Sequence, residues 1–159
     1  MERKILLLGD KRLYEKSIPI EKDEIESLAP IITDMHDTLM AFRKKYKVGR
    51  AIAAPQIGVF KRLIYMHVDQ PLALLNPILN FTDTKMIEVM DDCMSFPNLL
   101  VLVNRYKKCR IAYRDTNWKQ CVLHADNDIA ELLQHEYDHL DGILATMKAI
   151  DNKSFYVKK

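Results

Sequence analysis

Residues 134–140 read Gln-His-Glu-Tyr-Asp-His-Leu, and this stretch decides both the fold and the chemistry of the chain. Two histidines four residues apart on an α-helix project from the same face, so His135 and His139 can bind one cation together. Glu136 stands one position after the first histidine, from where its carboxylate can reach a water on the cation. The stretch predicts a metal site with its own general base.

The residues around this stretch predict that it lies on a helix. Asp128 can cap the helix, Glu131 completes a capping box, and Gly142 can end the helix in a left-handed conformation. Apolar residues recur at helical spacing and predict a buried stripe: Ile129, Leu132, Leu133 and Leu140. The alternative, two ordinary histidines beside a surface glutamate, is disfavoured because the pattern lies on a helix as its mechanism requires.

The length and charge of the chain restrict its class. A chain of 159 residues predicts one domain over residues 1–159 with a core of its own. Lys and Arg number 24 against 22 Asp and Glu, a net charge of +2, which is too even to indicate nucleic-acid binding. A peptide or small-molecule substrate is expected instead.

The cysteines and the first residues indicate the compartment. Cys93, Cys109 and Cys121 form no C-x-x-C pair and are odd in number, so a disulfide framework is not expected. The apolar run Ile5–Leu8 is too short for a signal peptide, and no stretch has membrane-spanning length. We expect a cytoplasmic protein without a membrane interaction.

The hydrophobic pattern changes along the chain from helical to strand-like. Residues 22–46 have an amphipathic helical pattern that Pro30 interrupts, which predicts a kink or a second helix starting near the proline. Short strands are expected at residues 62–68, 72–75, 85–90, 99–103, 109–113 and 120–123, with a turn at 115–117. The segment 155–159 is expected to be a strand or a frayed end. The order predicts an α+β fold in which antiparallel sheets pack around a central C-terminal His-Glu-x-x-His helix, with an N-terminal amphipathic helix.

A catalytic metal of this kind needs a third protein ligand. No Glu or His follows His139, which excludes the simplest protease arrangement. Cys109 and Cys121 alternate with apolar strand residues and are interpreted as buried hydrophobes, and isolated histidines are the default for His36, His67 and His124. Cys93 lies in a loop between two strands, among acidic and turn-forming residues. It is the favoured third ligand.

A glycine-flanked segment at residues 48–58 reads Val-Gly-Arg-Ala-Ile-Ala-Ala-Pro-Gln-Ile-Gly. Its small residues can line a groove where an extended peptide pairs with the edge of the protein, and Gln56 offers an amide donor for an oxyanion. Tight packing is the alternative explanation for such a segment.

Together, the glycine-flanked segment, Asn76-Pro77, the Cys93 loop and the His-Glu-x-x-His stretch resemble the peptide deformylases over nearly the whole chain. These enzymes remove the formyl group from the N-terminal methionine of new polypeptides. The resemblance implies that Cys93, His135 and His139 bind the metal and that Glu136 is the general acid and base. It also implies that Gln56 and the backbone amide of Met94 hold the oxyanion.

The resemblance also implies the cofactor and the partners. The family metal is usually Fe²⁺, and Zn²⁺, Ni²⁺ or Co²⁺ can occupy the site. A thiolate with two imidazoles accepts this group of metals on chemical grounds as well. The expected substrate is an N-formylmethionyl peptide bound by Gly49, Arg50 and Ala51, and the ribosome near the nascent-chain exit is the implied partner.

The chain departs from the family pattern in both loops. Ala51 stands where a second glycine is usual, Arg50 replaces an apolar residue, and Asp92 stands for the glycine before the cysteine. Asp91 keeps a carboxylate, for which Arg105 is the expected ion-pair partner. The charge of Asp92 is expected to alter the substrate groove, with Arg50 compensating it. Two alternatives stay open: an amidase or peptidase with altered acyl-peptide specificity, and a non-catalytic module that binds peptide N-termini.

Overall fold

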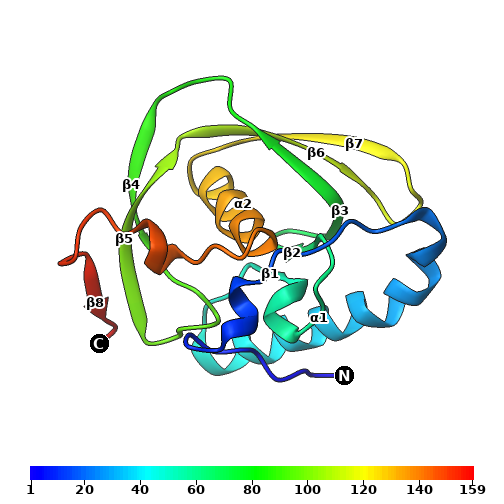
Figure 1. Cartoon of the computed structure of the whole chain (residues 1–159), viewed down its shortest axis with the longest axis horizontal. Coiled ribbons are helices and arrows are strands. Elements are labelled where there is room, and N and C mark those ends of the chain that lie inside the picture. Colours follow the sequence, from blue (N-terminus) through cyan, green and yellow to red (C-terminus); the bar gives the residue numbers. More distant parts are fainter.

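The computed structural model describes all 159 residues and has an α+β architecture (Figure 1). The helices are α1 (Ile25–Tyr46) and α2 (Asn127–Leu140). The strands are β1 (Ala51–Ala53), β2 (Leu63–His67), β3 (Pro71–Asn80), β4 (Met86–Asp91), β5 (Leu99–Tyr106), β6 (Lys108–Arg114), β7 (Gln120–Asp126) and β8 (Phe155–Val157). Four 3₁₀ turns complete it: η1 (Lys11–Tyr14), η2 (Lys22–Glu24), η3 (Ala54–Ile57) and η4 (Ala145–Lys148). No helix is both long and apolar enough to cross a membrane.

The strands form two antiparallel sheets, as expected. The larger sheet has the order β1-β2-β3-β6-β7, and the smaller has the order β4-β5-β8. Figure 1 shows α2 at the centre of the molecule, between the strands of the two sheets, and α1 along one side. The predicted central helix is therefore confirmed.

The strands β1 and β2 are covered on both faces, which explains why their sequences are apolar without alternation. Ala51 and Ala53 of β1 pack in one core cluster with α2, whereas Ile52 between them packs in a second cluster with α1. In β2, Ile64 faces the α2 side and Leu63 faces the α1 side in the same way. The end of the large sheet is thus held between the two helices.

The strand predictions are correct in place, but four of them, for β3, β5, β6 and β7, are shorter than the observed strands. The strand at residues 72–75 continues through Asn76-Pro77 to Asn80, with an irregular register between Leu75 and Ile78. Asn76 adopts a positive φ of 48° there, and its side chain bonds both backbone groups of Ile20 at 2.8 Å. The residues interpreted as the end of a strand are a bulge inside it.

Helix α1 is continuous from Ile25 to Tyr46, so the prediction of a second helix starting near Pro30 is wrong. The proline is exposed, and buried residues before and after it pack in one core cluster, among them Leu28 and Met35. Packing of this apolar stripe keeps the helix in one piece despite the missing amide donor.

Helix α2 ends as predicted but begins elsewhere. The residue before its first turn is Asp126, not Asp128, and no side chain caps it. At the other end Gly142 has a φ of +70°, its N–H bonds the carbonyl of His139 at 3.1 Å, and the N–H of Ile143 bonds that of Asp138 at 2.9 Å. These two bonds form a Schellman motif. A Cβ at Gly142 would also collide with the carbonyl of Tyr14, so glycine is required twice over.

Candidate active site

Three possible metal ligands meet where α2 faces the loop after β4. The donor atoms of Cys93, His135 and His139 all lie within 4.8 Å of one another, and all three residues are buried. The thiol of Cys93 is 3.3 Å from Nε2 of His139. One thiolate and two imidazoles at this spacing fit a single divalent cation of the borderline class. No other group of three His, Cys, Asp or Glu residues in the chain has this geometry.

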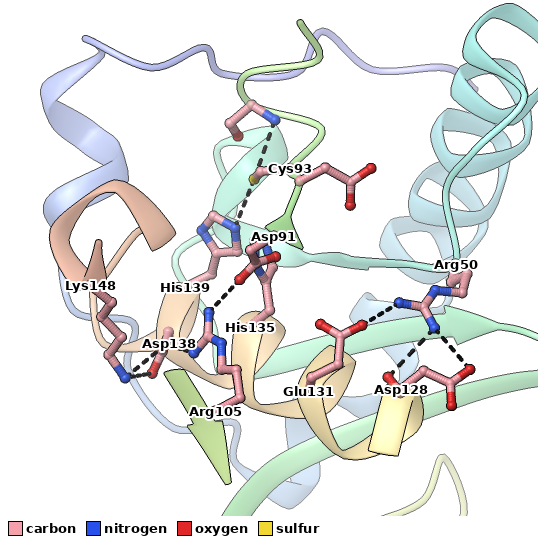
Figure 2. Close-up of polar contacts among 12 residues, drawn as sticks. Arg50, Asp91, Cys93, Arg105, Asp128, Glu131, His135, Asp138, His139 and Lys148 are labelled. Atoms are coloured by element: carbon pink, nitrogen blue, oxygen red, sulfur yellow. Dashed lines mark hydrogen bonds and ion pairs between the residues drawn. The ribbon is translucent and has the colours of Figure 1, made fainter. Parts of the chain in front are cut away.

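A chain of ion pairs runs from the surface to one of these ligands (Figure 2). Lys148 contacts Asp138 at 3.0 Å, Asp138 contacts Arg105 at 2.6 Å, and Arg105 contacts Asp91 at 2.7 Å. Asp91 then lies 2.8 Å from Nδ1 of His135. The predicted Asp91–Arg105 pair is present, and Asp138 and Lys148 extend it. A carboxylate on Nδ1 fixes the ring and leaves Nε2 for a metal.

Burial and this network set the charges of the site. Burial opposes ionisation of Asp91, but His135 and Arg105 lower the pKa of its carboxyl to about 2. Burial likewise works against protonated His135, yet Asp91 and Cys93 raise the pKa of His135 well above its usual value. For His139 burial prevails and lowers the pKa well below the usual range. The pKa shifts therefore favour an ionised Asp91 beside His135 and a neutral His139, the form in which an imidazole can bind a cation.

Glu136 lines a cavity of about 560 Å³ together with Cys93 and His135. The residue is 4% exposed, and its Oε2 atom has no hydrogen-bond partner in the chain. Burial raises the pKa of Glu136 to about 7, close to the pH at which a general base works best. An unpartnered buried carboxylate oxygen is costly unless something binds it, which suits a water or substrate in the cavity.

The two expected oxyanion donors both lie near Cys93. Met94 follows it, lines the cavity, and its backbone N–H donates to no group of the chain. Gln56 is 1% exposed and is not among the residues that line the cavity; its Nε2 lies 3.5 Å from Cys93 Sγ and 3.1 Å from the hydroxyl of Ser95. Its Oε1 accepts the N–H of Ala53 at 3.0 Å, which fixes the orientation of the amide. Ser95 was not singled out from the sequence.

The glycine-flanked segment forms another wall of the cavity. Gly49, Arg50 and Ala51 line it, and β1 is the outer strand of its sheet, so one edge has no strand beside it. Arg43 of α1 holds this segment by donating to the Gly49 carbonyl at 2.9 Å and to the carbonyl of His67. An extended peptide can add to such an edge.

The expectation that Arg50 compensates Asp92 is wrong. Arg50 pairs instead with Glu131 at 2.8 Å, as Figure 2 shows, and Asp92 pairs with Lys158 at 3.0 Å. Glu131 lies one helical turn before His135 and faces the cavity, so the residue assigned to a capping box has another role. Lys158 was not predicted as a site residue.

Comparisons with known proteins agree with this geometry. A family model described as polypeptide deformylase matches residues 2–155. The chain belongs to the polypeptide deformylase family. A peptide deformylase from Brachyspira hyodysenteriae is 36% identical over 168 residues, which cover 100% of this chain and 84% of the relative.

Solved structures extend this result to the fold. The crystal structure of peptide deformylase from Thermotoga maritima matches with a TM-score of 0.86 at 27% identity, covering 95% of this chain and 99% of that chain. A peptide deformylase from Synechococcus elongatus, solved in complex with actinonin, matches with a TM-score of 0.85 at 29% identity, covering 94% of this chain and 80% of that one. The resemblance inferred from the motifs is confirmed: the chain is a metal-dependent hydrolase of the deformylase family, and neither alternative is favoured.

Proposed function

We propose that this chain removes the N-formyl group from the initiator methionine of nascent polypeptides and releases formate. The observation that carries the proposal is the position of Glu136, whose unpartnered buried oxygen lies in the same cavity as the thiol of Cys93 and the ring of His135. A base beside a set of three metal ligands fits hydrolysis of an amide. Residues 1–159 would then form one catalytic domain.

Cys93, His135 and His139 are the residues that would hold one divalent metal ion. Fe²⁺ is the proposed metal in the cell, with Zn²⁺, Ni²⁺ and Co²⁺ able to replace it, because a thiolate with two imidazoles binds all four. When bound, the ion supplies Lewis-acid chemistry that makes water a stronger acid and attracts electrons from a carbonyl oxygen.

Glu136 moves the proton. Its carboxylate accepts a proton from the attacking water, and the oxygen of that water bonds to the formyl carbon. The oxyanion that forms would meet the unused N–H of Met94 and the side-chain amide of Gln56, whose orientation is fixed by the N–H of Ala53. Glu136 then gives its proton to the amine nitrogen as the carbon–nitrogen bond breaks, and formate and the free N-terminus leave.

The peptide is proposed to lie as an added strand along the open edge of β1, at Gly49, Arg50 and Ala51. Backbone pairing of this kind is independent of the peptide's sequence, which suits an enzyme that must act on many nascent chains. We place the enzyme in the cytoplasm, close to the ribosomal exit where such chains emerge.

The test is formate release from a formyl-Met-Ala-Ser peptide by protein loaded anaerobically with Fe²⁺ or Ni²⁺. The Glu136→Ala variant should keep its metal and lose at least about 100-fold in kcat, the range that general acid–base groups contribute. Glu88→Ala is the matched control, because Glu88 is exposed on β4 and makes no ion pair. No release by metal-loaded wild type, or an unchanged rate in Glu136→Ala, would contradict the proposal.

A further inference from the structure

Four carboxylates line the cavity, and three of them are ion-paired. The pairs are Asp91 with Arg105, Glu131 with Arg50, and Asp92 with Lys158. The fourth carboxylate, that of Glu136, has no ion-pair partner and carries the chemistry. The Asp92–Lys158 pair contributes neither to the metal ligands nor to the oxyanion donors, so its presence in the cavity wall requires another explanation.

The position of Lys158 is fixed by the backbone. Strand β8 pairs with β5, with Val157 opposite Leu99, and the N–H of Lys158 bonds the carbonyl of Asn98 at 3.0 Å. Figure 1 shows β8 beside β5 at the edge of the smaller sheet. The ammonium group of Lys158 reaches 66 positions back along the sequence to Asp92 and lies at the cavity wall with it.

Asp92 places a carboxylate directly before Cys93 in the sequence. Its side chain is 46% exposed and that of Lys158 is 26% exposed, so both charges are open to a peptide that enters the cavity. An exposed pair of this kind stabilises the fold little. Loss of one partner has a larger effect on a bound ligand, because the remaining uncompensated charge attracts or repels a charged side chain nearby.

We propose that Lys158 determines the charge tolerance of the substrate groove, by neutralising Asp92 where the residues after the formylated one pass. This inference rests on the proposed function. With the pair intact, Lys158 neutralises Asp92, so a peptide beside the pair meets no net charge from these two residues. Without Lys158, Asp92 favours basic peptides; without Asp92, Lys158 favours acidic ones. The strand β8 is thereby part of the active site.

The expected effect is modest and measurable. A unit charge about 7 Å from another, across an effective dielectric constant of about 50, changes binding by about fivefold. Basic and acidic peptides shift in opposite directions, so the ratio of their kcat/KM values changes by more than either value alone. The shift must shrink at about 1 M salt, where charges are screened within about 3 Å.

The experiment compares kcat/KM for amidated formyl-Met-Ala-Lys and formyl-Met-Ala-Glu at low salt in metal-loaded protein. Lys158→Met should shift the ratio of the two kcat/KM values at least about fivefold from its wild-type value toward the lysine peptide. Asp92→Asn should shift it toward the glutamate peptide. The double variant Asp92→Asn/Lys158→Met should return to the wild-type ratio, and Lys159→Met is the matched control that leaves the ratio unchanged.

The inference is overturned if wild type and Lys158→Met both release formate with the same ratio, or if the double variant keeps the shift. A shift that persists in high salt would also overturn it, because the effect would then not be electrostatic. Failure of the proposed function looks different: metal-loaded wild type would release no formate from any formyl peptide, and this inference would fall with it.

Discussion

Replacing Arg105 by leucine tests the ion-pair chain that supports the metal ligands. Arg105 is 1% exposed and contacts two buried carboxylates, Asp91 at 2.7 Å and Asp138 at 2.6 Å. After the change Asp138 keeps Lys148 at 3.0 Å and Asp91 keeps His135 at 2.8 Å, but both buried carboxylates lose the guanidinium that lies between them. Breaking a buried pair in this way costs about 3–5 kcal/mol.

This cost is a large part of the stability of a domain, which is about 5–15 kcal/mol in total. The free energy of unfolding should be measured in urea by circular dichroism, with a chelator present for every variant, because a bound metal adds stability of its own. The same change should weaken metal binding by about 10–100-fold, since Asp91 then orients His135 less firmly.

Two further variants make the result specific to Arg105. Arg105→Lys keeps the charge but cannot bind two carboxylates with a planar guanidinium. Its free energy of unfolding should therefore lie between those of wild type and Arg105→Leu. Lys108→Leu, at an exposed position of β6 without an ion pair, should stay within about 0.5 kcal/mol of wild type. A loss below about 1 kcal/mol for Arg105→Leu would refute the argument from buried charge.

Three other outcomes are expected. Cys93→Ala should lose bound metal by elemental analysis, whereas Cys109→Ala should keep it; full occupancy in Cys93→Ala would show that the ligand assignment is wrong. Gly142→Ala should lose at least about 1 kcal/mol more stability than Gly58→Ala, because both glycines have positive φ but only Gly142 also has backbone in the way; equal losses would argue against the close approach. The pKa of Asp91 is about 2, below its ordinary 3.8, so its contribution is complete above pH about 4 and is lost as the pH falls toward about 2. Urea unfolding of metal-free protein should show that decline, and Asp91→Asn should reduce it; the same decline in both proteins would exclude Asp91 as a cause.

The elements whose apolar pattern repeats over many residues were predictable from the sequence. The His-Glu-x-x-His helix and six of the strands were found because apolar periodicity over several residues reflects burial of one face. Short elements gave no such signal. Strand β1 has only three residues, two of them alanines with low strand propensity, and its burial comes from helices on both faces.

The site residues that could be recognised from the chemistry of their own side chains were predictable. The ion pairs between residues far apart in the sequence were not. A thiol in an acidic loop and two histidines one helical turn apart pointed to Cys93, His135 and His139, which the structure brings together. The partners of Arg50 and Asp92 depend on which strands lie side by side. Lys158 in particular reaches the site only because β8 pairs with β5.

The proposed metal ligands come from two different parts of the hydrophobic core. Cys93 packs in a cluster with Val101 and Val103 of the smaller sheet, whereas the apolar residues of α2, the helix that carries both histidines, pack against the larger sheet. A metal held by all three would link the core cluster of the smaller sheet to the core cluster formed by α2 and the larger sheet. Amide protons of β4 and β5 should then exchange with solvent more slowly when the ion is present, so that the reaction centre and the mechanical integrity of the protein depend on the same few bonds.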